Sequence, residues 1–290
     1  MDYFDKSDPE KPKIHVSQST PLIVACASEA YLPILANWLI ALEVAGIDYS
    51  RVKIFAFDQI THDCAESWGI DAEQISWDGT IANFWLRRAE IFLELLSRGV
   101  TFVHSDLDAI WLKDPFPMLS TLGKDVDLIF SQGTWWPKDI HKEQGFVLCC
   151  GWFLARATEA SLRFFSDVVA DLEQTHDDQV SVNRLLFERK IKWTVCSNAA
   201  YHLEFRGAPI RCWSESVFGE CPDGGPSVAM LPHRLFQRIE DDANNIFVNH
   251  PLSPKSAAAK LASFEEAGLL YLDAPDAAVA GKPLRELART

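Results

Sequence analysis

The sequence predicts an α/β fold with a mostly parallel central sheet and helices on both faces. Short apolar runs rich in strand-forming residues alternate with longer segments whose apolar residues recur at helical spacing. Gly46 and Gly99 follow two of these helical segments, and glycine commonly ends a helix because it adopts a left-handed conformation without strain. Alternating strands and helices indicate a parallel sheet, in which ligands bind at the carboxyl ends of the strands.

The elements follow in order along the chain. In the first part, strands are expected at 21–27, 51–57 and 100–104, and helices at 30–45, from about 58 to 68, and at 84–96. Further strands are expected at 127–131, 146–155 and 192–196, and further helices at 158–173, 178–188 and beyond Ser256. The segment 201–249 is rich in Pro, Gly and Trp, which predicts loops and short strands. We expect a disordered lead-in over 1–19, a single domain over 20–272 and a tail over 273–290.

Composition and charge exclude several classes of protein. The 290 residues carry 27 Lys and Arg against 41 Asp and Glu, a net charge of −14, so we expect no nucleic-acid partner. Any bound phosphate must then be neutralised locally, by a metal ion or a few basic side chains. The seven cysteines include no Cys-x-x-Cys pair, which argues against a zinc cage or a disulfide framework. The N-terminal segment lacks the order of a signal peptide and no apolar run suffices for a membrane span, so a cytoplasmic protein is expected.

The most informative stretch is a buried strand that ends in two carboxylates, Asp106 and Asp108. In an extended segment residues i and i+2 point to the same side, so both carboxylates can converge on one hard divalent cation. Such a cation would clamp a diphosphate and neutralise a leaving group. An isolated Asp-x-Asp also occurs in solvated turns, and its place at the end of a strand favours a functional role.

Two further groups of residues have both structural and functional interpretations. Asp178 and Gln179 follow Asp177 at the start of a predicted helix, where carboxylates also cap free amides. His250 precedes Lys255 and Lys260 and is by itself no evidence of a metal site. The aromatic segments 134–137 and 211–213 suit stacking against a sugar as well as ordinary packing.

Together these segments resemble the nucleotide-diphospho-sugar transferase domain of glycosyltransferase family 77. The resemblance rests on Ser-Asp-x-Asp-x-x-Trp over 105–111 with Asp-Pro after it, on the Gly151 segment and on the Asp-Gln pair at 178–179, and it covers roughly 22–186. It implies a GT-A fold and retaining transfer of xylose, galactose or arabinose. The sequence departs from the family pattern at Cys149, where Asn is frequent, and at Val180, where an acidic residue follows the Asp-Gln pair.

The resemblance also implies roles at the metal and the nucleotide. Asp108 would be the main ligand of Mn²⁺ or Mg²⁺, and Asp106 would contact the metal, the ribose or the sugar. His250 resembles the C-terminal histidine that completes the metal site. Lys255 would hold the diphosphate, and Asp58, at the end of the second strand, the base or ribose.

At the transferred sugar or the diphosphate, the resemblance implies a contact from Arg88, with Arg87 as a close competitor. Gly151 would let the backbone approach the donor, Asp178 would hold sugar hydroxyls and Gln179 would face the anomeric carbon. Because an amide is a poor nucleophile, we expect front-face substitution rather than a covalent intermediate.

The expected function is therefore metal-dependent, retaining transfer of xylose or galactose from a UDP-sugar to an acceptor hydroxyl on an unknown glycan, protein, lipid or small molecule. One alternative is a metal-dependent nucleotidyltransferase, although a Gly-rich nucleotide loop does not follow the first strand. Another is a catalytically silent protein that binds sugar nucleotides or glycans.

Overall fold

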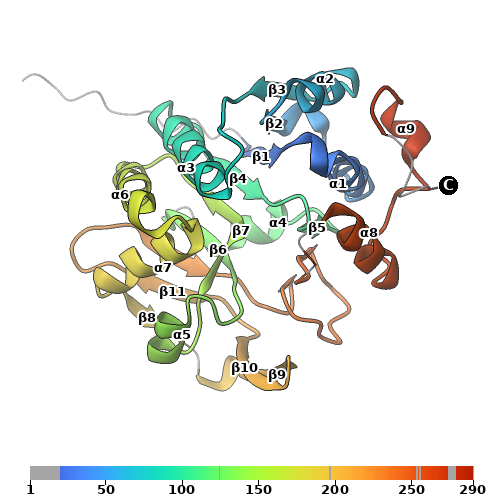
Figure 1. The fold of residues 1–290 in the computed structure, drawn as a ribbon. Helices are drawn as coiled ribbons and strands as arrows, with labels where there is room; N and C mark the ends of the chain where they lie inside the picture. Colours follow the sequence, from blue (N-terminus) through green and yellow to red (C-terminus); the bar gives the residue numbers. More distant parts are fainter. Residues whose placement is uncertain are drawn as a thin grey trace, which may run out of the picture.

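The computed structural model describes residues 20–123, 125–195, 197–252, 254, 256–273 and 279–289. The expected lead-in over 1–19 lies outside these residues, and so does Lys255. The described residues form a nine-stranded sheet in the order β3-β2-β1-β4-β7-β6-β12-β11-β8 with helices packed around it (Figure 1).

The sheet has a parallel half and a mixed half. The parallel half contains β1 (Leu22–Ala27), β2 (Val52–Ala56), β3 (Asp71–Gln74) and β4 (Phe102–Ser105). The mixed half contains β6 (Leu128–Gln132), β7 (Leu148–Ala155), β8 (Lys192–Thr194), β11 (Val217–Glu220) and β12 (Ser227–Met230). Strand β7 runs antiparallel to both β4 and β6, because the connection after β6 returns the chain beside that strand instead of crossing over the sheet. The sequence therefore predicted the α/β class correctly, but the parallel arrangement is limited to part of the sheet.

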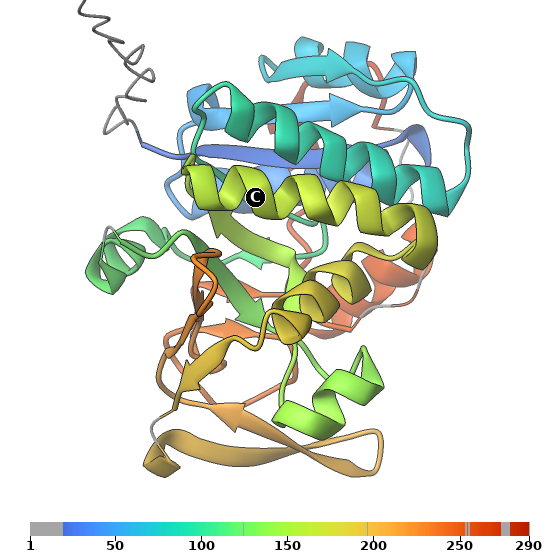
Figure 2. The ribbon, with the colours of Figure 1, turned by 90° about the vertical axis from the view of Figure 1, so that its left-hand side faces the viewer.

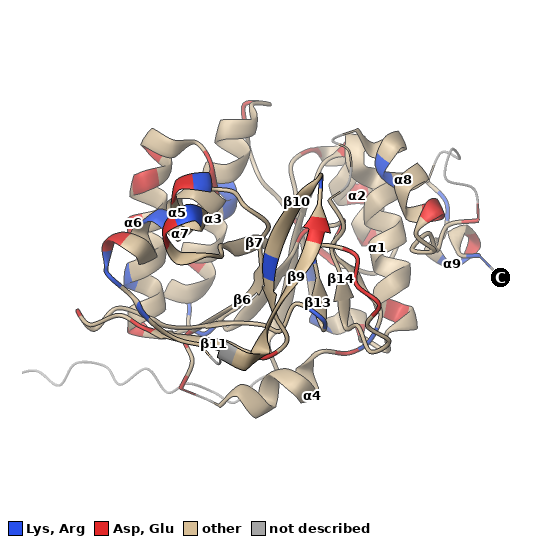
Figure 3. Cartoon of the chain, turned by 90° about the horizontal axis from the view of Figure 1, so that it is seen from below, with Lys and Arg blue, Asp and Glu red and all other residues tan. Residues whose placement is uncertain are grey.

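Helices cover both faces of the sheet, as Figures 2 and 3 show. One face carries α1 (Leu32–Val44), α2 (Gln59–Ser67), α8 (Ala257–Glu266) and α9 (Leu284–Leu287). The other carries α3 (Ile81–Ser97), α6 (Glu159–Thr175) and α7 (Asp178–Glu188). Shorter helical segments are α4 (Phe116–Leu119), α5 (Lys138–Gln144), η1 (Glu29–Tyr31), η2 (Tyr49–Arg51), η3 (Ser120–Leu122) and η4 (Ser197–Ala199).

Side-chain caps fix where several helices begin. Thr80, Thr158 and Asp177 precede α3, α6 and α7, and each side chain accepts a hydrogen bond from a backbone N–H in the first turn. Helix α1 is apolar on nearly all sides, which fits its position between the sheet and the helices α8 and α9. These contacts make the helical layers part of the core that supports the ends of the strands.

Two small sheets complete the fold. Strands β9 (Ala200–Phe205) and β10 (Ala208–Trp213) form an antiparallel hairpin. Strand β14 (Val248–Asn249) lies between β13 (Phe236–Gln237) and β5 (Ile110–Trp111), pairing antiparallel with β5. Asn249 pairs with Ile110, so the next residue after β14 comes to lie beside the segment that precedes β5.

The described part of the expected C-terminal tail packs on the domain. Leu284 and Leu287 of α9 are buried against the core around α1, and Leu272 forms a β-bridge with Ala288. The indole N–H of Trp68 donates to the carbonyl of Lys282 over 2.8 Å. Among the described residues, none of the helices is long and apolar enough to cross a membrane.

Candidate active site

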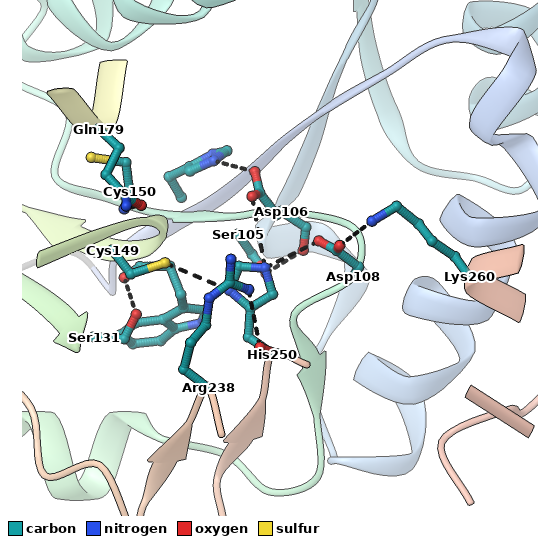
Figure 4. A network of polar contacts seen from close by, with 12 residues as sticks. Ser105, Asp106, Asp108, Ser131, Cys149, Cys150, Gln179, Arg238, His250 and Lys260 are labelled. Atoms are coloured by element: carbon teal, nitrogen blue, oxygen red, sulfur yellow. Dashed lines mark hydrogen bonds and ion pairs between the residues drawn. The ribbon is translucent and has the colours of Figure 1, made fainter. Parts of the chain in front are cut away.

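Two carboxylates and one imidazole converge just beyond the carboxyl end of β4 (Figure 4). The Nε2 of His250 lies 3.2 Å from Asp108 Oδ1 and 3.8 Å from Asp106 Oδ2. Carboxylate oxygens bind Mg²⁺ at about 2.0–2.1 Å, so neighbouring ligands of an octahedral ion of that size lie roughly 3 Å apart. The three side chains are therefore spaced to hold one divalent cation after small adjustments. Their mixed oxygen and nitrogen donor set suits Mn²⁺ better than Mg²⁺, which prefers oxygen.

Gly151, on β7, makes room for this cluster. A Cβ at Gly151 would collide with His250 Cε1 and with Asp106 Oδ2, and its carbonyl accepts the Asp106 N–H over 2.6 Å. The glycine is thus required by two side chains of the cluster. The sequence analysis gave a different reason for Gly151, namely that a glycine lets the backbone approach the donor. That contact with the donor stays a prediction.

Arg88, on α3, ties the cluster to a third carboxylate. Its Nη1 donates to Asp106 Oδ1 over 2.7 Å and its Nη2 donates to Asp178 Oδ2, while the guanidinium is only 3% exposed. Burial works to raise the pKa of Asp106, yet Arg88 and the neighbouring His104 hold it below its ordinary value. Arg87 instead pairs with Glu90 near the surface, so Arg88 is the arginine that faces the site.

Asp178 and Gln179 occupy the first turn of α7. Burial raises the pKa of Asp178 despite its ion pair with Arg88. The Gln179 amide is held at both ends, because its Nε2 donates to the Trp136 carbonyl over 2.6 Å and its Oε1 accepts the Cys150 N–H over 3.4 Å. These contacts hold the two side chains in fixed positions.

A pocket opens beside the cluster, between the end of β1 and the start of α3. Trp77, Phe84 and Trp85 give it an aromatic wall. Its charged lining comes from Arg88, Asp106, Asp108 and Lys260. Lys260, on α8, forms an ion pair with Asp108 Oδ2, which leaves Oδ1 turned toward His250 (Figure 4). Burial would raise the pKa of Asp108, but His250 and Lys260 hold it well below the ordinary value.

The sequence matches the nucleotide-diphospho-sugar transferase family over residues 52–254. The chain belongs to this family. Two similar proteins are enzymes of Arabidopsis thaliana. UDP-D-xylose:L-fucose alpha-1,3-D-xylosyltransferase MGP4 is 32% identical over 127 residues, which cover 40% of this chain and 35% of that protein. UDP-D-xylose:L-fucose alpha-1,3-D-xylosyltransferase 1 is 30% identical over 113 residues, covering 35% and 31%. The chain thus matches about a third of the length of these relatives.

The fold is also that of solved glycosyltransferase structures. The galactosyltransferase LgtC, solved with donor and acceptor sugar analogues, aligns over 86% of this chain and 95% of its own with a TM-score of 0.50 and 16% identity. At this identity the likeness concerns the fold alone. It confirms the GT-A type fold that the sequence of this family member predicted.

The structure brings together most of the site residues named from the sequence. Asp106, Asp108 and His250 form the cluster, and Arg88 and Gly151 lie against it. Asp178 adjoins the cluster through Arg88, and Gln179 contacts Cys150, the neighbour of Gly151 on β7. Asp58 instead uses both carboxylate oxygens on backbone, accepting the N–H of Thr61 and of Glu29, each over 2.7 Å. It caps α2 and fixes the loop after β1, so its contact with a base or ribose stays a prediction.

Three residues of the site had no assigned role in the sequence analysis. Lys260 forms an ion pair with Asp108. The signal in the sequence that could have indicated Lys260 was its position near the start of a helix that Ser256 caps. His104 Nε2 lies 3.2 Å from Asp106 Oδ1, and burial lowers its pKa to about 4, so the ring is neutral. Arg238 donates to the His250 carbonyl over 3.0 Å.

The aromatic segments divide into one core residue and one exposed residue. Trp213 is buried among core aromatics, so it packs inside the domain and cannot stack on a sugar. Trp136 is 47% exposed, and its indole N–H donates to Asp177 Oδ2 over 3.1 Å. An exposed indole therefore lies beside Gln179.

Proposed function

We propose that this protein is a metal-dependent glycosyltransferase that moves xylose or galactose from a UDP-sugar to an acceptor hydroxyl. The observation that carries the proposal is the convergence of Asp106, Asp108 and His250 beside a pocket that is lined by both aspartates and by Lys260. Asp106, Asp108 and His250 would hold Mn²⁺, or Mg²⁺ less well. Bound there, the ion would supply Lewis-acid stabilisation of the charge that develops on the leaving diphosphate.

The basic and aromatic residues of the pocket fit the rest of a sugar nucleotide. Lys260 adds a positive charge beside Asp108, where an anionic diphosphate needs one in this acidic protein. The aromatic wall of Trp77, Phe84 and Trp85 offers flat apolar surfaces for a base or ribose. Arg88 and Asp178, paired with each other, offer hydrogen bonds to sugar hydroxyls.

For the chemical step we propose front-face substitution with retention of configuration. The acceptor oxygen forms a bond to the anomeric carbon while the bond from that carbon to the diphosphate oxygen breaks. The bonding electron pair leaves with UDP, and the acceptor proton passes to a phosphate oxygen of UDP. Asp178 is engaged by Arg88 and Gln179 is an amide, so neither is a ready nucleophile for a covalent intermediate. A trapped glycosyl adduct on Asp178 would overturn this mechanism.

The donor sugar is proposed from the relatives. The Arabidopsis proteins are named as UDP-D-xylose:L-fucose xylosyltransferases, which favours UDP-xylose as the donor and makes an L-fucoside a sensible first acceptor. The match covers about a third of those proteins, so both assignments require direct measurement.

The experiment is donor breakdown without an acceptor. Purified protein is incubated with Mn²⁺ and each of UDP-xylose, UDP-galactose, UDP-glucose and UDP-arabinose, and the products are separated by chromatography. We expect UDP and free sugar from one donor, with loss in EDTA and in Asp108→Asn. Asp63→Asn, on the exposed surface of α2, is the matched control and should behave as wild type.

The products distinguish the alternatives. UMP with sugar 1-phosphate would mean attack at phosphorus, as expected of a nucleotidyltransferase. Metal-dependent binding of UDP without any breakdown, with or without methyl α-L-fucoside as acceptor, would mean a binding protein. Full activity of Asp108→Asn would contradict the proposed metal site.

A further inference from the structure

The two ring nitrogens of His250 face different partners. Its Nε2 points to Asp106 and Asp108, at the distances given above, and its Nδ1 lies 3.8 Å from the sulfur of Cys149 (Figure 4). Both side chains are buried, with His250 3% and Cys149 1% exposed. The contact is therefore sheltered from bulk water, and the sulfur is the side-chain partner of the ring nitrogen that faces away from the carboxylates.

A histidine that binds a metal through one nitrogen needs a partner for the other. The ligand nitrogen must carry a lone pair, so in the neutral ring the proton lies on the other nitrogen and is donated to a nearby acceptor. That acceptor fixes both the tautomer and the orientation of the ring, and it is usually a carboxylate, a backbone carbonyl or water. At His250 a cysteine sulfur, a weak acceptor whose hydrogen bonds are long, takes this position.

Strand β7 explains how the sulfur reaches the ring. Cys149 and Gly151 are two residues apart on β7, and both lie against the His250 ring, although the pairing of β7 with β6 is irregular at this point. At Gly151 the missing side chain gives room to the Cε1 of His250, and at Cys149 the sulfur meets the adjacent Nδ1. Cys150 faces the opposite side, where its sulfur lies 3.8 Å from the Asp178 carbonyl.

The backbone of His250 is fixed independently of the ring. Its N–H donates to the Gln237 carbonyl over 2.8 Å, and its carbonyl accepts from Arg238 over 3.0 Å. The remaining freedom is rotation of the imidazole about its own side-chain bonds. Gly151 leaves room for the ring, and the Cys149 sulfur is the side-chain contact at its Nδ1 edge.

We propose that Cys149 is a positioning residue that accepts the Nδ1 proton of His250 and so presents Nε2 to the metal. The inference rests on the proposed metal-dependent function, and it assigns a role to the residue at which this chain departs from the asparagine frequent in the family it resembles. Cys149 acts through His250 and does not touch the metal or the donor.

The first measurement uses Mn²⁺ alone. Free Mn²⁺ is quantified by electron paramagnetic resonance during titration of wild type, Cys149→Ala, Cys149→Asn and Cys64→Ala. Removing such a partner typically weakens metal binding 10- to 100-fold, and we expect a loss in about this range for Cys149→Ala. Asn has nearly the volume of Cys and its carbonyl accepts a hydrogen bond, so Cys149→Asn should restore most of the affinity. Cys64, a buried cysteine on α2, is the matched control and its variant should bind as wild type.

The second measurement uses a diamagnetic ion and no activity. With Mg²⁺ bound at Nε2, the proton of the neutral His250 ring lies on Nδ1, and ¹H–¹⁵N NMR reports the hydrogen bond of that proton. We expect a slowly exchanging Nδ1–H in wild type and in Cys149→Asn, and a faster-exchanging Nδ1–H in Cys149→Ala. Circular dichroism verifies that each variant is folded, and His250→Gln assigns the signal.

The outcomes separate the two proposals. Wild-type affinity for Mn²⁺ in Cys149→Ala, or an unchanged exchange rate of the Nδ1 proton in that variant, would overturn the role of Cys149 and leave the proposed function standing. If wild type itself bound neither Mn²⁺ nor Mg²⁺, the proposed function would fall, and the role of Cys149 with it.

Discussion

Replacing Arg88 by Met should destabilise the domain strongly, because it leaves two carboxylates without their shared partner. Arg88 donates to both Asp106 and Asp178 and is itself 3% exposed. Removing one member of a buried ion pair costs about 3–5 kcal/mol, since the remaining charge stays desolvated and unpaired. The side chain of Asp178 is 11% exposed and that of Asp106 is 30% exposed, so most of the loss arises at Asp178. We expect the free energy of unfolding to fall by about 3 kcal/mol at pH 7.

The loss should depend on pH with a definite sign. Without Arg88, the pKa values of Asp106 and Asp178 in the folded protein rise above those of the unfolded chain. The folded variant then binds more protons than the unfolded one, so its stability decreases as the pH rises through that window. The difference from wild type should therefore be larger at pH 7 than at pH 5.

Urea unfolding of the metal-free protein, followed by tryptophan fluorescence, measures these quantities. The double variant Arg88→Met/Asp178→Asn removes the stranded carboxylate and should recover at least half of the loss. A loss below about 1 kcal/mol that is equal at both pH values would refute the reasoning, because that is the range of an exposed ion pair. So would a double variant no more stable than Arg88→Met alone.

Three further predictions concern Lys260 in the pocket, the buried His233 and the exposed Trp136. Lys260→Met should weaken UDP binding in the presence of Mn²⁺ about tenfold or more by calorimetry, since a charge-assisted hydrogen bond is worth about 1.5–3 kcal/mol; equal weakening by the exposed Lys142→Met would contradict a specific role. His233 Nε2 accepts the N–H groups of Arg238 and Ile239, and burial lowers its pKa to about 4. Because the unfolded chain takes up this proton at about pH 6.5, His233 should cause up to about 3 kcal/mol of stability to be lost as the pH falls from 6.5 to 4. That slope should flatten in His233→Gln. An equal slope in wild type and in His233→Gln would mean that the ring is solvated in the folded protein and would contradict the prediction. Trp136→Ala should raise the KM for methyl α-L-fucoside several-fold more than that for the donor in initial-rate kinetics, with Trp136→Phe intermediate, whereas equal effects on both substrates would place the indole outside the acceptor site.

Local patterns were sufficient for the first half of the fold and for the carboxylate pair. Strands β1, β2 and β4 and helices α1, α2 and α3 have clear apolar patterns, and each lies within a few residues of its predicted range. Asp106 and Asp108 were predictable because their relation depends only on the geometry of an extended segment. The family resemblance indicated Arg88, with Arg87 as a competitor, and the structure places Arg88 rather than Arg87 against Asp106 and Asp178. The contact of Arg88 with a sugar or diphosphate stays a prediction.

The remaining features depend on contacts between distant segments. The antiparallel position of β7 is set by the route of the chain after β6, which leaves no periodic signal. His250 joins the site because β14 pairs with β5, and both strands are only two residues long. Asp58 is equally instructive, since the same position at a strand end suits a ligand contact and a helix cap, and only the structure reveals the two amides that it binds.

The pairing of β14 with β5 also determines when the site can be assembled. During synthesis the two aspartates leave the ribosome with β4, whereas the histidine follows more than a hundred residues later. The candidate metal site of Asp106, Asp108 and His250 is therefore a contact of high sequence separation that forms late, after the parallel half of the sheet can already fold. An ion bound there would link the C-terminal part of the chain to β4 and would stabilise that closure by mass action. Metal should accordingly protect the amides of β13 and β14 from hydrogen exchange more than those of β1 and β2.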